Sequence, residues 1–238
     1  MQNMAILQCQ KLLNKTQLAQ LSFPFQNSAK TNQFREEDFL NLVENYAAVN
    51  FFKKFFSQNN EIPSLILKGE RFCGKTHLLH IFAQKSGAEF LDKEKISDVN
   101  FSSFFTEKSF YILEDINEIK DEELLLCLIN SAAESGAFLV LSANSSLNFK
   151  LKDLTSRLKN IFVAEIKNPG YESVKLLLTH SFSRRQVKLS QVVINYLSDN
   201  IERSYEAIFA VVKLVELQVQ ENGKNVTLGE VKKLLNRH

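Results

Sequence analysis

The sequence predicts a parallel α/β domain followed by a smaller, entirely helical domain, and three observations lead to this fold class. Short apolar runs alternate with helical periods between residues 65 and 165. A phosphate-loop motif joins the first strand of this alternation to its first helix. Asn168-Pro169-Gly170 then interrupts the pattern, and only helical periods follow it.

The same periodicity places the individual elements. An amphipathic pattern over residues 38–56 predicts a helix in the second half of that stretch. The strands of a five-stranded parallel sheet are expected at 65–68, 89–91, 110–113, 138–141 and 161–165, sandwiched by helices at 75–84, 122–133 and 151–158. The helical domain is expected to contain helices at 172–182, 191–198, 205–220 and 228–235, the last opened by a capping box at Thr227-Leu228-Gly229-Glu230.

The first 33 residues differ in composition from the rest of the chain. They are rich in Gln, Asn, Lys and Ser, and their apolar runs are too short to sustain a helix. We therefore expect a flexible tail over residues 1–33, an α/β domain over 34–168 and a helical lid over 169–238. Within the tail, Gln20-Leu21-Ser22-Phe23-Pro24-Phe25 places large apolar residues around a proline, which favours an extended segment that docks in a groove.

Composition excludes several classes of protein. The 29 basic and 27 acidic residues leave a net charge of only +2, so we expect no strong autonomous DNA binding. No basic leader and no apolar run of about 20 residues is present, which predicts a cytoplasmic protein without a membrane helix. The cysteines, Cys9, Cys73 and Cys127, lack the paired spacing of a disulfide framework or a zinc site.

The phosphate-loop motif is the strongest functional signal in the chain. Gly69-Glu70-Arg71-Phe72-Cys73-Gly74-Lys75-Thr76 fits the pattern G-x-x-x-x-G-K-S/T and directly follows an apolar run. The two glycines permit turns that point backbone N–H groups at phosphate oxygens, and Lys75 adds a positive charge. Thr76 would offer its hydroxyl to Mg²⁺, and the helix that starts here and includes His77 adds its dipole. Residues 69–77 are therefore the predicted nucleotide-binding segment.

Two further strands end in polar residues. Glu114 and Asp115 follow strand 110–113, and Asn144 follows strand 138–141. In a parallel sheet, all three would reach the edge that carries the phosphate loop. One carboxylate would hold Mg²⁺ through its water shell, and the other could orient or deprotonate an attacking water. Thr76, Glu114 and Asp115 are thus the predicted metal site, and Asp115 and Asn144 are predicted catalytic residues.

The order of phosphate loop, acidic strand, polar-tipped strand and helical lid resembles AAA+ ATPases. Three segments carry a closer resemblance to the DnaA/Hda family of replication initiators and regulators. They are Arg35-Glu36-Glu37-Asp38-Phe39-Leu40 followed by Asn45, Gly74-Lys75-Thr76-His77-Leu78-Leu79-His80, and Leu154-Thr155-Ser156-Arg157-Leu158. The last is similar to the family's arginine-finger box, which implies that Arg157 acts in trans on a neighbour's ATP. The tail hexapeptide over residues 20–25 resembles the clamp-binding motif of the Hda proteins.

The chain departs from the family's pattern at three positions. Glu114 stands where the family usually has an aspartate, and Asn144 replaces an acidic residue that is often present at the first sensor. Glu206 aligns with the sensor arginine of the lid. Either Arg203 takes over that contact from a different angle or the lid does not sense the γ-phosphate.

The resemblance implies an Hda-like regulator that binds ADP or ATP with Mg²⁺. It would attach to the DNA polymerase III sliding clamp (the β subunit) through residues 20–25 and stimulate ATP hydrolysis by DnaA through Arg157. The alternative is an autonomous AAA+ ATPase of the initiator or helicase-loader type, in which Lys75, Asp115 and Asn144 carry the chemistry. A third hypothesis is a clamp-tethered adaptor with a purely structural nucleotide. The sequence leaves self-association into a homo-oligomer open.

Overall fold

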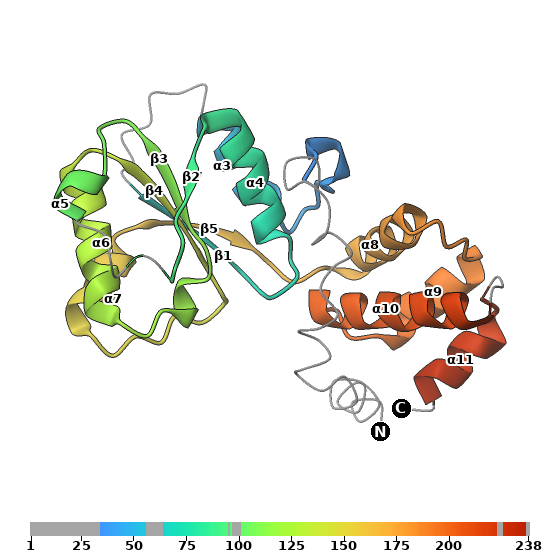
Figure 1. The fold of residues 1–238 in the computed structure, drawn as a ribbon. Helices are drawn as coiled ribbons and strands as arrows, with labels where there is room; N and C mark the ends of the chain where they lie inside the picture. Colours follow the sequence, from blue (N-terminus) through green and yellow to red (C-terminus); the bar gives the residue numbers. More distant parts are fainter. Residues whose placement is uncertain (1–33, 56–63, 95, 97–100, 223–225, 237–238) are drawn as a thin grey trace. The chain divides into compact units, whose positions relative to one another are not determined.

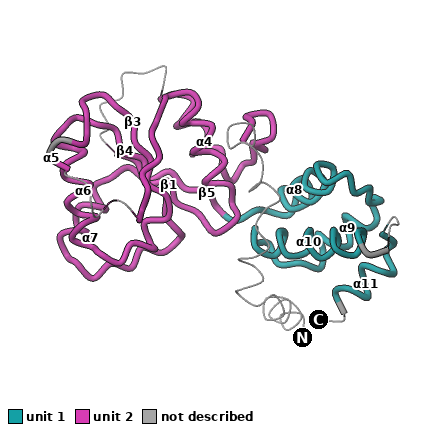
Figure 2. Tube along the Cα trace, in the orientation of Figure 1, with its two compact units in different colours: residues 1–33, 168–238 teal, residues 34–167 magenta. Residues whose placement is uncertain are grey.

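The computed structural model describes residues 34–55, 64–94, 96, 101–222 and 226–236 (Figure 1). The chain divides into two compact units, one formed by residues 34–167 and the other including residues 168–238 (Figure 2). The tail hexapeptide expected to bind a clamp, residues 20–25, lies outside the described residues, as does Cys9.

The first unit is built on a five-stranded sheet in which every neighbouring pair is parallel, in the order β2-β3-β4-β1-β5. The sequence prediction of a parallel five-stranded sheet is therefore confirmed. The central strands, β1 and β4, are almost completely buried, which explains their uninterrupted apolar runs. The strands are β1 (Ser64–Gly69), β2 (Glu89–Phe90), β3 (Phe110–Leu113), β4 (Phe138–Ala143) and β5 (Phe162–Ile166).

Helices cover both faces of this sheet (Figure 1). The helices α3 (Tyr46–Phe55) and α4 (Lys75–Ser86) lie on one face, where Phe52 contacts Phe82 and Phe55 contacts Phe138 with ring centroids 4.9 and 4.3 Å apart. The other face carries α5 (Phe101–Phe104), α6 (Glu122–Glu134) and α7 (Lys152–Lys159), and the buried core there includes residues of α6, α7 and the central strands. These phenylalanines are buried core residues.

The expected elements are all present, with ends that differ by at most two residues from the sequence-based bounds. The sequence did not predict α5 or the two 3-10 turns η1 (Glu36–Asp38) and η3 (Ile116–Glu118). These segments contain three or four residues, which is too short for a helical period to become visible.

The second unit contains the helices α8 (Tyr171–Arg184), α9 (Gln191–Asn200), α10 (Tyr205–Asn222) and α11 (Leu228–Asn236). They pack around an apolar core whose members include Leu178, Phe182, Leu197 and Val231. The predicted capping box is confirmed, because the backbone N–H of Thr227 donates to Glu230 Oε2 over 2.7 Å and the Glu230 N–H donates to the Thr227 hydroxyl over 3.4 Å. Within the described residues, no helix combines the length and the apolar character needed to cross a membrane.

Candidate nucleotide-binding site

The phosphate loop turns tightly between the end of β1 at Gly69 and the start of α4. A Cβ atom added to Gly69 would lie 2.7 Å from Cys73 Sγ and 3.1 Å from the carbonyl oxygen of Ile166. Phe72 and Gly74 have φ angles of 64° and 95°, in the left-handed region that favours glycine. Left-handed residues at these positions let successive backbone N–H groups point into the same concavity, as phosphate binding requires.

Lys75 lies inside this loop and is only 7% exposed. Its Nζ donates to the carbonyl oxygens of Gly69 and Glu70, each over 2.9 Å. Among the described residues, no carboxylate forms an ion pair with this ammonium group. Because a buried charge with only neutral acceptors is poorly compensated, and because the α4 N-terminus adds a positive dipole, the loop suits a polyphosphate.

The remaining loop side chains have different surroundings. The Arg71 guanidinium lies on the surface, 5.2 Å from the ring centroid of Phe72. Burial raises the pKa of the Cys73 thiol, so this cysteine is protonated at neutral pH. Cys73 and Cys127, the two described cysteines, are both free thiols.

The end of β3 meets the phosphate loop directly. The Thr76 hydroxyl donates to Glu114 Oε1 over 2.7 Å. Burial raises the pKa of the Glu114 carboxyl, and the neighbouring charge of Asp115 acts in the same direction. The structure thus brings together Thr76 and Glu114, which are 38 residues apart along the chain, and Asp115 follows Glu114 directly.

Two polar residues that the sequence interpretation missed hold this edge of the sheet. The hydroxyl of Ser142, a fully buried residue of β4, accepts a 2.8 Å hydrogen bond from the backbone N–H of Asp115. The side chain of Asn117 accepts from the N–H of Asn144 and donates to the carbonyl of Ser146, both over 2.7 Å. A serine within an otherwise apolar strand was the one signal that could have identified Ser142.

The residues at this edge fit Mg²⁺ only together with a nucleotide. Thr76, Glu114 and Asp115 offer one hydroxyl and two carboxylates, and the described part of the chain contains no cluster of three or more His, Cys, Asp or Glu side chains arranged to hold a metal ion. Mg²⁺ commonly keeps several waters and takes its other ligands from a carboxylate or two and from phosphate oxygens. The site therefore suits a metal ion that arrives with a nucleotide.

The first described residues lie across the start of α4. The Phe34 ring stacks on His80 at 4.1 Å with an interplanar angle of 3°, and the Arg35 carbonyl oxygen lies 2.9 Å from His77 Nε2. The Phe39 ring packs edge-on against His77. Burial lowers the pKa of His80, and the nearby His77 contributes to the same shift. His77, a predicted nucleotide contact, is thus held by the segment that precedes α3.

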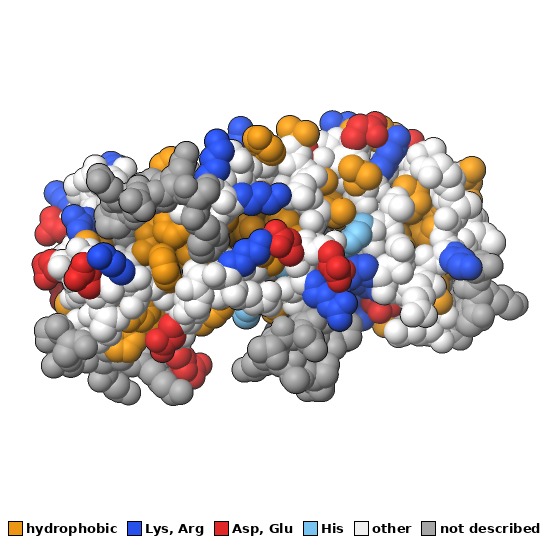
Figure 3. Space-filling view, turned by 90° about the horizontal axis from the view of Figure 1, so that it is seen from above, with side chains coloured by type: hydrophobic (Ala, Val, Ile, Leu, Met, Phe, Trp, Pro, Cys, Tyr) orange, Lys and Arg blue, Asp and Glu red, His pale blue; other side chains and the backbone are white. Residues whose placement is uncertain are grey.

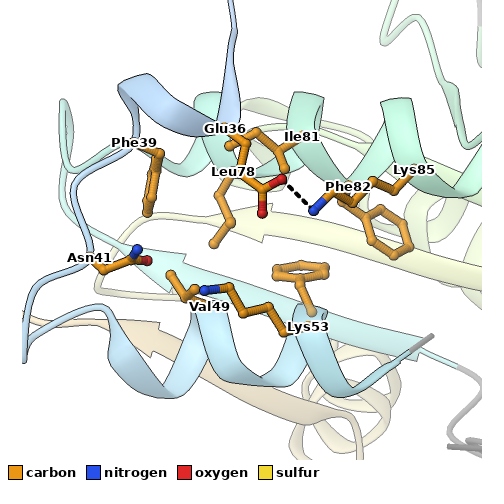
Figure 4. Close-up of a pocket in the computed structure, with 10 residues that line it drawn as sticks. Glu36, Phe39, Asn41, Val49, Lys53, Leu78, Ile81, Phe82 and Lys85 are labelled. Atoms are coloured by element: carbon orange, nitrogen blue, oxygen red, sulfur yellow. Dashed lines mark ion pairs between the residues drawn. The ribbon is translucent and has the colours of Figure 1, made fainter. Parts of the chain in front are cut away.

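A cavity of about 140 Å³ lies beside the loop, between η1, α3 and α4 (Figure 4). Phe39 separates it from the phosphate loop, since its ring would lie 3.2 Å from a Cβ atom on Gly74. An ion pair of 2.6 Å between Glu36 and Lys85 closes one side. The other lining residues are Asn41, Val49, Phe52, Lys53, Leu78, Ile81 and Phe82. None of them belongs to residues 69–77, so this cavity is separate from the predicted phosphate contacts.

Arg157 lies on the exposed side of α7. Leu154 and Leu158 anchor the opposite side of that helix in the core, with exposed fractions of 0% and 5%. The guanidinium makes no hydrogen bond or ion pair with any other described residue, including residues 69–77. Arg157 is therefore presented to solvent from a rigid support, and the structure does not bring it into the phosphate loop.

The two lid residues considered for nucleotide sensing both belong to the helical unit. The Arg203 guanidinium lies 5.7 Å from the centroid of the Tyr171 ring, and the Lys175 ammonium lies 4.2 Å from the same centroid. Glu206 lies in the first turn of α10.

On the face shown in Figure 3, basic and acidic side chains are interspersed, with no continuous basic stripe.

No family model matches the sequence, but curated proteins are similar to it, among them the following two. The chromosomal replication initiator protein DnaA of Buchnera aphidicola subsp. Cinara cedri is 24% identical over 227 residues, which cover 83% of this chain and 50% of the relative. An uncharacterised protein of Haemophilus influenzae is 27% identical over 193 residues, covering 73% of this chain and 82% of that protein. The chain spans about half the length of the DnaA relative.

Solved structures share the fold. Domain III of DnaA from Thermotoga maritima has a TM-score of 0.68 and 19% identity, covering 84% of this chain and 95% of that one. AMPPCP-bound DnaA from Aquifex aeolicus gives 0.60 and 18%, over 80% of this chain and 67% of that one. The RuvB Holliday junction branch migration motor of Thermotoga maritima gives 0.65 and 14%, over 88% and 73%. The chain therefore has the AAA+ fold, and its sequence similarity is to DnaA-type initiators.

Replacement of Gly69 by alanine tests the geometry of the loop. We expect Gly69→Ala to lower the free energy of unfolding of the ligand-free protein by about 1–3 kcal/mol, because the new methyl group would overlap Cys73 Sγ and crowd Ile166. The additional substitution Cys73→Ala removes the sulfur and should restore part of this loss. Urea-induced unfolding measures both variants. A Gly69→Ala variant as stable as the wild type would contradict the close approach.

Proposed function

We propose that the chain is an Hda-like regulator of replication initiation. It binds adenine nucleotide in the phosphate loop, attaches to the sliding clamp through residues 20–25 and uses Arg157 to stimulate ATP hydrolysis by DnaA. The sequence similarity to DnaA initiators supports a role in replication initiation. The fold shared with AMPPCP-bound DnaA, together with the Lys75 ammonium inside the loop, supports the choice of ADP or ATP with Mg²⁺.

The observation that carries the proposal is the exposed guanidinium of Arg157, which pairs with no other residue that the structure describes and belongs to a helix anchored in the core. An exposed arginine on a helix that is anchored in the core can contact a second molecule without losing any contact within its own unit. Lys152 and Lys159 also lie on exposed positions of α7, against a single acid, Asp153. These lysines are five and two positions from Arg157, so they lie on another side of the helix, and only Arg157 is assigned to the polyphosphate of a second molecule.

The guanidinium would act on the nucleotide of the partner. Its planar N–H donors match the oxygens of a phosphoryl group, and its charge opposes the negative charge that develops in the transition state. In other systems, an arginine supplied by a partner protein accelerates hydrolysis by about 10³-fold or more. The nucleotide held by this chain's own loop would then stabilise the fold that presents Arg157.

The second candidate, an autonomous AAA+ ATPase, is favoured by the hydrogen bond between Thr76 and Glu114 and by Asp115 next to it. Those residues are what hydrolysis within one chain would need. The two candidates differ in a single assay. An autonomous ATPase releases phosphate from ATP in the absence of DnaA and stops doing so when Lys75 is replaced by alanine, whereas the regulator releases phosphate only when DnaA-ATP is present.

Clamp attachment rests on the sequence of residues 20–25, which lie outside the described residues. The double variant Leu21→Ala/Phe23→Ala removes two of the three large apolar side chains of the hexapeptide and should abolish capture by immobilised sliding clamp. Its affinity for ADP should equal that of the wild type, which serves as the folding control. Undiminished capture of the double variant would show that this motif does not bind the clamp.

The variant Arg157→Ala tests the action in trans. We expect it to reduce the stimulation of DnaA-ATP hydrolysis by about 10³-fold, while its nucleotide and clamp affinities stay at wild-type values. Arg157→Lys should not restore stimulation, because an ammonium group lacks the planar fork of donors. Lys159→Ala, which removes an equal charge from the same turn of α7, is the matched control. Wild-type stimulation by Arg157→Ala would refute this role.

A further inference from the structure

The helix that carries Arg157 begins without a capping side chain of its own. Its N-cap residue is Leu151, which offers no hydrogen-bond acceptor beyond its backbone. Helix N-termini leave backbone N–H groups without partners within the helix. An acceptor for the backbone N–H groups at the start of α7 must therefore come from solvent or from another part of the chain.

Glu122, in the first turn of α6, supplies an acceptor for the N-cap residue Leu151 and for Lys150, the residue before it. Its Oε2 accepts hydrogen bonds from the backbone N–H groups of Leu151 over 2.6 Å and Lys150 over 2.9 Å, and Oε1 lies 3.1 Å from the Lys150 nitrogen. These bonds lower the pKa of the Glu122 carboxyl, so the group is ionised at neutral pH. A carboxylate at this position also interacts favourably with the positive end of the α7 dipole.

Glu122 is available for this contact because α6 has a separate cap. The Asp121 side chain accepts from the backbone N–H of Leu124 over 2.9 Å, which satisfies the start of α6. The next residue, Glu123, is an exposed acid of the same turn that forms no hydrogen bond or ion pair with any other described residue. Of these two adjacent glutamates, only Glu122 binds the backbone at the start of α7.

Side chains of η3 and α6 bind the two ends of the connection between β4 and α7. Asn117 binds the backbone of Asn144 and Ser146 at the end near the phosphate loop, and Glu122 binds the end near Arg157. Leu154 and Leu158 bury one side of α7, but apolar packing is non-directional and tolerates small shifts of the helix. The directional bonds at Leu151 fix where the helix starts, about 9 Å from Arg157 at 1.5 Å per residue.

We propose that Glu122 is a positioning residue for Arg157: its carboxylate fixes the start of α7 and thereby the direction in which the guanidinium leaves the surface. This inference rests on the proposed function of Arg157. A phosphoryl group in its transition state is sensitive to displacements of about 1 Å in the groups that surround it. Loosening the start of α7 should therefore weaken stimulation of the partner while leaving the phosphate loop of this chain unchanged.

The first test measures the hydrogen bonds themselves. In the chain of 238 residues, amide hydrogen exchange at Lys150 and Leu151 should become about 10-fold faster or more in Glu122→Ala. Glu122→Gln should exchange at an intermediate rate, because its amide oxygen still accepts hydrogen bonds without the charge. Glu123→Ala, which removes the same charge one residue away, should exchange like the wild type. Unchanged exchange in Glu122→Ala would overturn the proposal.

The second test measures the stimulation of DnaA-ATP hydrolysis. Glu122→Ala should reduce it by about 10-fold, with ADP affinity within about 2-fold of the wild type. Glu122→Gln, which keeps an acceptor, should recover part of the loss, and Glu123→Ala should stimulate fully. The double variant Glu122→Ala/Arg157→Ala should be no weaker than Arg157→Ala, because Glu122 acts only through Arg157.

The possible failures are distinguishable. If Arg157→Ala loses stimulation but Glu122→Ala retains it, the proposed function stands and the positioning role is overturned. If Glu123→Ala impairs stimulation as much as Glu122→Ala, general charge loss explains the effect and the role is again overturned. If Arg157→Ala itself stimulates normally, the proposed function fails and the positioning role fails with it.

Discussion

The burial of the Lys75 ammonium inside its own loop is the constraint on which the rest of the first unit depends. The two carbonyl oxygens that accept from Lys75 belong to Gly69 and Glu70, so β1 must end and α4 must begin within a few residues of each other. That turn leaves little room for a side chain on Gly69, and it places Phe72 and Gly74 in the left-handed region. Because both acceptors are neutral, the positive charge remains available for an anion.

The order of the strands turns this loop into a larger site. β4 lies between β1 and β3, so Ser142 of β4 can hold the backbone of Asp115, while Glu114 reaches Thr76 at the start of α4. The connection that leaves β4 then leads to α7, which carries Arg157 on its exposed side. One domain therefore holds a phosphate loop for its own nucleotide and presents, on a separate helix, an arginine suited to a neighbour's nucleotide.

The sequence sufficed to predict whatever depended on local patterns. Apolar runs located the strands to within two residues, and the fixed spacing of Gly69, Gly74, Lys75 and Thr76 identified the phosphate loop. The missed contacts, those of Ser142, Asn117 and Glu122, join residues 27 to 29 positions apart, and no local period encodes such pairs. Glu122 and Glu123 are indistinguishable in sequence, and only the packing of α6 beside α7 separates their roles.

We propose that the charge held in the loop binds a nucleotide diphosphate. Calorimetric titration of the purified chain with ADP, at several Mg²⁺ concentrations, tests it most directly. We predict saturable binding with one site per chain, an affinity at least about 10-fold lower for Lys75→Ala, and no change for Lys53→Ala, which removes an exposed lysine outside the loop. Absence of ADP and ATP binding by the wild-type protein at every Mg²⁺ concentration would contradict the claim.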